Sequence, residues 1–384
     1  DSNDATIQGS DGFNATFLDE TGAAQTGFAA GTQQVQIDSD GANNQVQAVN
    51  DITIERSGSN TPANADTVIN GVVTSSGAGS TVSIEANQDI FFGVDGDVSR
   101  TDGGATGLIH VQSDVFDATS TGGVITMADG AVINGGGHEI EILADGTLTI
   151  GEIITTDVVN AASIAANIAD ADAGAGNDIS AAGLAISGET GVGSDADAIE
   201  TTLGSLSGRA NSGDFNISNT GNLTLDAVAL TTFVQGLFGE MEVIGVTIED
   251  MGAGGGVANS TADNITIVSA GTLSVSVATD ADGDTGGISN EDGGNIVLTT
   301  TGTNDLTISG DVEVNDSDAT EGDGDGNIDI NSGQDVIVNN NASVNVDNEG
   351  QIMIDATRAI SVSTTNADVT SVDGSIALTA NAGG

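Results

Sequence analysis

Pairs of large apolar residues separated by one position recur along the C-terminal part of the chain. The clearest pairs are Ile328/Ile330, Val336/Val338, Val344/Val346, Ile352/Ile354, Ile360/Val362 and Ile376/Leu378. The first five begin eight positions apart, and the sixth restores a multiple of eight after Val369 and Val372 interrupt the spacing. Since alternate residues of a strand share one face, each pair predicts a short strand with both large side chains on one side.

Such short strands cannot bury an apolar face alone, which predicts a fold in which they stack. Three strands per coil, in a triangle of about 24 residues, would point the paired side chains inward. Ile328, Ile352 and Ile376 would then lie above one another, as would Val336 and Ile360. The alternative is a run of β-hairpins in sandwiches, which have longer strands and often proline, tyrosine or tryptophan at corners and in cores. The chain has one proline and no tyrosine or tryptophan, which favours an all-β solenoid.

Weaker copies of the pattern extend toward the N-terminus. They include Ile265/Ile267, Leu273/Val275, Ile296/Leu298, Leu306/Ile308 and Val312/Val314, with loops expected at residues 279–290 and 315–326. Earlier copies are Val82/Ile84, Ile90/Phe92, Ile109/Val111, Ile140/Ile142 and Leu148/Ile150. The pattern therefore predicts solenoid coils over residues 35–154 and more regular coils over residues 213–384.

Two regions fit the pattern poorly. Residues 155–212 are rich in alanine and glycine, and Val158, Ala162, Ala165 and Ile168 have helical spacing. We interpret this region as an irregular insertion with one short helix or, alternatively, as degenerate coils. Residues 1–34 contain Phe13, Phe17 and Phe28. They predict an N-terminal cap over the first open coil or, alternatively, an exchanged segment whose phenylalanines form an interface with a neighbouring subunit.

Charge excludes several kinds of partner. The chain has 57 acidic residues against four arginines and no lysine, for a formal net charge of −53. Nucleic acid is excluded because phosphate neutralisation needs a basic surface. Docking on an anionic membrane is disfavoured for the same reason, and no apolar run is long enough for membrane insertion. Cysteine is absent, which excludes disulfides and thiol chemistry.

Five segments resemble a known kind of bacterial surface protein. They are GNLTL (221–225), AGTLSVSV (270–277), GGNIVLTT (293–300), GNIDINSGQDVIV (326–338) and DGSIALTA (373–380). These segments resemble the shaft repeats of filamentous haemagglutinin-like adhesins, which are large secreted proteins. The resemblance covers residues 210–384 well and 45–150 loosely. It implies a right-handed parallel β-helix and carries no catalytic residues over from the shaft.

Calcium is the ligand that the acidic clusters favour. Asp280, Asp282, Asp284 and Glu291 occupy positions 1, 3, 5 and 12 of an EF-hand-like loop, although Thr285 stands where that loop needs glycine. A second cluster alternates with glycine and contains Asp316, Asp318, Glu321, Asp323 and Asp325. Such oxygen-rich clusters suit hard cations. The alternative is that both clusters are solvated loops between strands.

The two histidines, His110 and His138, give little support for catalysis. His138 follows three glycines, as in loops of β-helical polysaccharide-degrading enzymes, but the nearest arginine in sequence, Arg100, is 38 positions away. We interpret His138 as a turn histidine on an acidic surface. No serine has the surroundings of a nucleophile elbow. The expectation is that the protein is not an enzyme.

The function that these features favour is structural. Residues 373–384 still have the pattern of the solenoid, and an open strand edge can pair with another chain. We expect a secreted, extracellular or cell-surface protein that forms a homopolymer: a filament, sheath, surface layer or matrix assembled through solenoid ends. The first alternative is an adhesin shaft that binds surface glycans through inserted loops, including those at 155–212. A β-helical polysaccharide-degrading enzyme is the minor alternative.

Overall fold

The computed structural model is built from β-strands, and the residues that it describes contain no helix. These are residues 5–9, 17–18, 24–25, 35–38, 45–48, 50–56, 66–102, 106–114, 122–172, 174, 176–228, 246–248, 263–276, 287–290, 293–314, 326–347 and 349–381. They divide into two compact units, one ending at Ala182 and the other beginning at Gly183. No helix suited to crossing a membrane occurs in this part of the chain.

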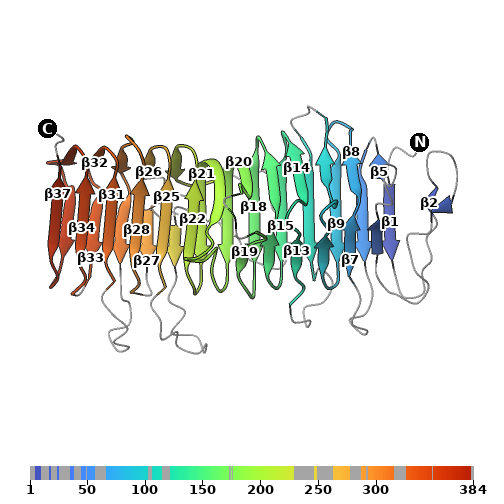
Figure 1. The fold of residues 1–384 in the computed structure, drawn as a ribbon, viewed down its shortest axis with the longest axis horizontal. Helices are drawn as coiled ribbons and strands as arrows, with labels where there is room; N and C mark the ends of the chain where they lie inside the picture. The colour runs from blue at the N-terminus through green and yellow to red at the C-terminus, as the bar shows by residue number, and fades with distance from the viewer. Residues whose placement is uncertain are drawn as a thin grey trace. The chain divides into compact units, whose positions relative to one another are not determined.

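The strands of the first unit stack in three columns of parallel neighbours (Figure 1). The first column contains β4 (Val35–Asp38), β7 (Thr67–Asn70), β10 (Ile90–Phe92), β13 (Ile125–Met127), β16 (Leu148–Ile150) and β19 (Ile168–Asp170). The second contains β5 (Gln45–Ala48), β8 (Val72–Ser75), β11 (Val98–Arg100), β14 (Val132–Gly136) and β17 (Glu152–Thr155), which pairs with the start of β20 (Ile179–Gly188). The third contains β1 (Ala5–Gly9), β6 (Ile52–Arg56), β9 (Thr81–Ala86), β12 (Leu108–Ser113), β15 (Glu139–Ala144) and β18 (Val158–Ser163). A short antiparallel pair, β2 (Phe17–Leu18) and β3 (Ala24–Gln25), stands apart from the columns.

The second unit repeats this arrangement. Its long strand β21 (Ile199–Ala210) pairs in turn with the first strand of each column. The first column contains β22 (Phe215–Asn219), β25 (Ile265–Ser269), β28 (Ile296–Thr300), β31 (Ile328–Ser332), β34 (Ile352–Ala356) and β37 (Ile376–Ala380). The second contains β23 (Leu223–Leu225), β26 (Leu273–Val275), β29 (Leu306–Ile308), β32 (Asp335–Val338) and β35 (Ala359–Val362). The third contains β24 (Val246–Ile248), β27 (Gly287–Asn290), β30 (Asp311–Val314), β33 (Ser343–Val346) and β36 (Asp368–Ser371).

The register confirms the predicted parallel solenoid with three strands per coil. Ile328 pairs with Ile352, and Ile352 pairs with Ile376, so the coil repeats every 24 positions in this region. Val336 pairs with Ile360 in the second column. Handedness stays a prediction.

The core of each unit is a thin stack of aliphatic side chains. Strands such as β28 and β31 alternate buried and partly exposed residues, so that Ile328 and Ile330 are fully buried. Phe92 and Phe215 are the largest side chains buried in this way. Isoleucine, valine and leucine suit these positions because branched side chains pack well on a pleated surface.

Side-chain amides join successive coils of the second unit where each first-column strand begins. The Oδ1 atom of Asn264 accepts hydrogen bonds from the backbone N–H of Asn295 at 3.0 Å and from its amide at 2.9 Å. Asn295 accepts the same two bonds from Asn327, at 2.9 and 3.0 Å. The ladder continues to the backbone N–H of Gln351 at 2.8 Å. These bonds occupy backbone donors that the turns would otherwise leave unpaired.

The same corner carries a column of glycines. A Cβ atom on Gly326 would lie 2.2 Å from the carbonyl oxygen of Gly294, and one on Gly350 would lie 2.1 Å from that of Gly326. Gly374 repeats the contact at 1.9 Å from the carbonyl oxygen of Gly350. Only a residue without a side chain lets the coils approach so closely.

Residues 155–212 are not an irregular insertion, and the prediction of a short helix there is wrong. They contain β18, β19, β20 and β21. Ile168 of β19 pairs with Leu148 of the preceding coil, which agrees with the alternative of degenerate coils. The loop expected at 279–290 also contains a strand, β27, because Ile288 stacks on Val312. Within the predicted cap, β1 joins the third column, and most other residues of 1–34 lie outside the described residues.

Candidate functional site

The metal and interface residues predicted from the sequence lie outside the part of the chain that the structure describes. This applies to Asp280, Asp282, Asp284, Glu291, Asp316, Asp318, Glu321, Asp323 and Asp325. It applies equally to Phe13 and Phe28, and for Phe17 only the backbone, in β2, is described. Calcium binding by the two acidic loops and the phenylalanine interface therefore stay predictions.

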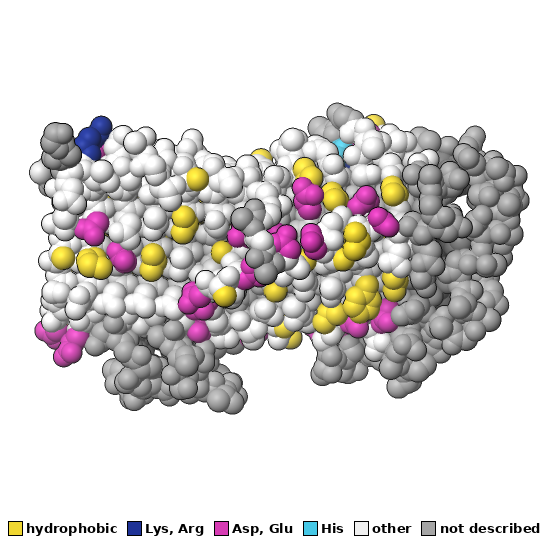
Figure 2. All heavy atoms as spheres, viewed as in Figure 1, with side chains coloured by type: hydrophobic (Ala, Val, Ile, Leu, Met, Phe, Trp, Pro, Cys, Tyr) yellow, Lys and Arg dark blue, Asp and Glu magenta, His cyan; other side chains and the backbone are white. Residues whose placement is uncertain are grey.

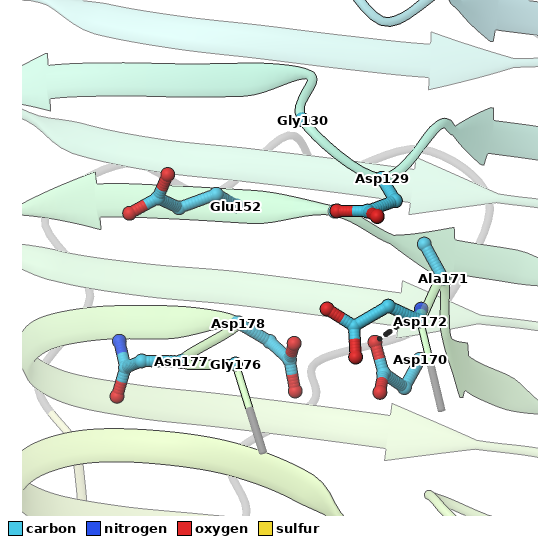
Figure 3. A pocket seen from close by; sticks show the side chains of 10 residues that line it. Asp129, Gly130, Glu152, Asp170, Ala171, Asp172, Gly176, Asn177 and Asp178 are labelled. Carbon is cyan, nitrogen blue, oxygen red and sulfur yellow. Dashed lines mark hydrogen bonds between the residues drawn. The ribbon is translucent and has the colours of Figure 1, made fainter. Parts of the chain in front are cut away.

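A different acidic cluster lies in the first unit, around a hollow of about 220 Å³ (Figure 3). Five carboxylates line it: Asp129, Glu152, Asp170, Asp172 and Asp178. They come from three successive coils, at the corner where strands of the first column end and those of the second begin. The stacking of coils thus gathers carboxylates that are up to 49 positions apart, from 129 to 178.

The carboxylates of Asp170, Asp172 and Asp178 point toward one another (Figure 3). Carboxylate oxygens of Asp170 and Asp178 lie within 4.8 Å of each other, and Asp178 is only 3% exposed. The loop folds around its own side chains: Asp170 accepts the backbone N–H of Asp172 at 3.0 Å, and Asp172 accepts that of Gly174. None of the described residues that line the hollow is basic. Asp170 and Asp178 belong to a group of carboxylates that could hold a metal ion, since hard cations prefer several oxygen ligands.

Sequence reasoning missed this cluster because it lies in the stretch interpreted as irregular. The alternation Asp170-Ala-Asp172-Ala-Gly174, followed by Gly176 and Asp178, was the available signal. The sequence alone could not have assigned Glu152 and Asp129 to the same cluster, because their proximity follows from the pairing of β13, β16 and β19.

His138 is not a surface histidine, as the sequence had suggested, but a buried one. It is 1% exposed, and its Nε2 atom lies 3.2 Å from Oδ1 of Asp102. Arg100 reaches the same oxygen with Nη2 at 2.7 Å and also donates to the carbonyl of Gly77 at 3.2 Å. Burial lowers the pKa of Arg100, and the charge of Asp102 opposes that shift. The corners of successive coils therefore bring together residues that are 38 positions apart.

His110 lies on β12 and interacts with a residue of β15, the neighbouring strand of the third column. Its Nδ1 atom lies 2.8 Å from Oε2 of Glu141, the residue paired with it on β15. Its Nε2 atom lies 3.2 Å from Oε1 of Gln112. Both ring nitrogens thus lie within hydrogen-bonding distance of side-chain oxygens on the third column. Neither histidine lines the acidic hollow.

Corner carboxylates in both units carry shifted pKa values. In the first unit, burial raises the pKa of Asp89, although the N–H of Val124 acts in the opposite direction. In the second unit, the hydrogen bonds from Arg358 hold the pKa of Asp335 below its ordinary value. Arg358 lies beside Asp335 on the surface of the second unit, with Nε 2.7 Å from Oδ1. Acidic side chains are spread over the face drawn in Figure 2, where basic ones are visible at one place only.

The coil formed by β35, β36 and β37, here called the terminal coil, presents an apolar edge. Ile376 is 44% exposed and Leu378 is 51% exposed, whereas their partners one coil earlier, Ile352 and Ile354, are fully buried. Val362 and Val372 are likewise exposed, at 37% and 65%.

No protein-family model matches the chain, and neither a curated protein nor a solved structure is similar enough to count as a match.

Proposed function

We propose that the protein is a secreted, extracellular structural protein, a solenoid subunit that polymerises with copies of itself through coil edges. The role requires no catalytic centre. The observation that supports the proposal is the stacking of coils by parallel strand pairing over buried aliphatic columns, as with Ile328, Ile352 and Ile376. Covering a side chain of this kind contributes about 1.5–3 kcal/mol. Backbone groups of β37 add hydrogen bonds to any strand that pairs with it.

The charge of the chain sets a condition on such assembly. Two copies with a formal net charge of −53 each repel one another. Salt screens charges beyond about 8–10 Å at ionic strengths of 0.10–0.15 M, and divalent cations bridge carboxylates. The proposed subunit should therefore assemble in salt or calcium and dissociate when both are withdrawn.

We expect Leu378→Lys to abolish assembly, because it places a charge on the apolar edge of the terminal coil. Met353→Lys is the matched control: it changes the net charge equally, but Met353 points outward and is already 43% exposed. Electron microscopy and sedimentation velocity in sodium chloride, with and without calcium, measure the outcome. A wild-type protein that stays monomeric in every condition would falsify the proposal. If Leu378→Lys and Met353→Lys assembled equally well, the terminal coil would not be the surface through which the subunits assemble.

The adhesive alternative loses part of its basis. It relied on inserted loops at 155–212 to contact glycans, and those residues form coil strands instead. The resemblance of the repeats to bacterial adhesin shafts remains compatible with a structural subunit at the cell surface.

A second proposed role is calcium binding at the acidic hollow of the first unit. The supporting observation is the convergence of Asp170, Asp172 and Asp178 around a space whose described lining residues include no basic side chain. Calcium takes six to eight oxygen ligands, and five carboxylates with water can supply them.

The double variant Asp170→Asn/Asp172→Asn should lose this site. Removing two negative ligands should weaken binding about tenfold or more, since charge count sets calcium affinity. Isothermal titration calorimetry with calcium chloride would show one site fewer than in the wild type. Asp95→Asn, in an exposed turn of the same unit, is the control. A double variant that titrates like this control would rule the hollow out as a calcium site.

A further inference from the structure

The second unit contains several copies of the triplet Asn-x-Ser/Thr, the sequence at which sugars are attached to asparagine amides of secreted proteins. Among the described residues, the triplet begins at Asn216, Asn222, Asn264 and Asn341. It also begins at Asn14, Asn259 and Asn315, which lie outside the described residues. The triplet arises often by chance in a chain rich in asparagine, serine and threonine. Burial and hydrogen bonding therefore decide which of the four described amides is available.

Three of the four asparagines are held in place by burial or by bonds between coils. Asn216 lies within β22 and is only 2% exposed. Asn222 is exposed, but its Oδ1 atom accepts the backbone N–H of Thr272, one coil later, at 3.0 Å. Asn264 belongs to the ladder of amides that joins successive coils and accepts two bonds from Asn295. These contacts account for asparagine at the three positions, and a bulky group on the amides would compete with them.

Asn341 differs because it stands in an exposed turn between β32 and β33. The turn covers residues 339–342 and is closed by a bond of 3.3 Å from the N–H of Ala342 to the carbonyl of Asn339. Asn341 has a φ of 65°, a left-handed conformation that asparagine tolerates better than most residues. Its Oδ1 atom accepts a bond from Nδ2 of Asn366 at 3.2 Å. Its own Nδ2 atom makes no hydrogen bond with any residue in the described part of the chain.

The turn of the following coil provides an internal comparison. Asn366 lies one coil after Asn341, is also exposed and has a φ of 53°. Its triplet ends in Asp368, whereas that of Asn341 ends in Ser343, and these two residues are register partners. Both turns thus present an asparagine in a similar backbone conformation, but only the first has a hydroxyl group two positions later.

We propose that Asn341 carries an N-linked sugar chain, attached by a glycosyltransferase of the cell that secretes the protein. The transfer breaks the bond between C1 of the sugar and a phosphate oxygen of a lipid-linked oligosaccharide pyrophosphate, and it forms a bond from C1 to Nδ2 of Asn341. The amide loses one proton, and the lipid pyrophosphate leaves with the electron pair of the broken bond. This inference rests on the secreted location in the proposed function. The sugar projects from a corner of the coil, away from the paired strands.

Mass spectrometry of peptides from the extracellular protein, purified from the cells that produce it, tests the inference. The peptide that contains Asn341 should have the added mass of a sugar chain, and its fragments should place the sugar on Asn341 and not on Asn366. Asn341→Asp removes the amide nitrogen but suits the left-handed turn, and it should lose the added mass. Ser343→Ala should lose it as well. Ser343→Thr is the matched control and should keep it, because it retains the hydroxyl group.

An unmodified Asn341 in protein recovered outside the cell would overturn the inference, while the proposed function, which is judged by assembly, would stand. Sugar that persists in Ser343→Ala, or that is found on Asn366, would overturn it too, because the triplet would then not direct the attachment. Sugar on Asn216 or Asn264 with none on Asn341 would show that exposure in the fold does not select the acceptor. If the protein is found only inside the cell and Asn341 is unmodified, the inference and the secreted location both fail.

Discussion

Gly326→Ala is expected to destabilise the second unit by about 1–3 kcal/mol or more. The added Cβ atom would lie 2.2 Å from the carbonyl oxygen of Gly294, a backbone atom that cannot rotate away. Relief of this contact requires neighbouring coils to separate, which weakens the pairing of β28 with β31. Urea unfolding followed by circular dichroism should show a lower midpoint.

Gly221→Ala is the matched control for this substitution. Gly221 also lies at a corner of the second unit, but the nearest atoms to its added Cβ would be 3.9 Å away. In the unfolded chain, both substitutions remove the same backbone freedom, so the comparison isolates the contact between coils. Equal urea midpoints for Gly326→Ala and Gly221→Ala would contradict the close approach of neighbouring coils at the column of glycines.

Ile330→Ala is expected to cost about 2–5 kcal/mol, the range for truncating a fully buried aliphatic side chain. Ile330 is fully buried between Leu298 of the preceding coil and Ile354 of the following one. The core is narrow and its side chains are held by backbone pairing, so the cavity has little means of collapsing. Chemical unfolding of the variant measures the loss.

Ile337→Ala makes the same chemical change on the neighbouring strand β32 and serves as its control. Ile337 is paired with Thr307 and Ser361 on the outward side and is only partly buried. Its truncation should cost less than about 1 kcal/mol. If both variants lost similar stability, the assignment of inward and outward positions in these strands would be wrong.

The sequence predicted the fold well where its pattern was regular. The pairs from Ile328 to Leu378 specify both the inward face of each strand and the length of the coil, so the stacking of Ile328, Ile352 and Ile376 followed from spacing alone. Residues 155–212 escaped the prediction because alanine and glycine give little contrast between inward and outward positions. There, the strands are identified by pairing with distant residues, as Ile168 is by Leu148.

The candidate sites could be predicted far less well. Two of the carboxylates in the acidic hollow, Asp129 and Glu152, lie in other coils than Asp170, and the insertions between strands vary in length. No fixed period therefore relates these residues in the sequence.

By itself, the sequence determined that this protein is an acidic, all-β solenoid with short strands, because alternation and composition are local properties that need no knowledge of distant contacts. The tertiary structure alone decided which corners meet. It buried His138 beside Asp102 and Arg100, and it gathered Asp170, Asp172 and Asp178 around one hollow. The physical reason is that the residues brought together at a corner depend on the lengths of the segments between strands. Those lengths vary from coil to coil, so the local pattern does not predict which corner residues become neighbours.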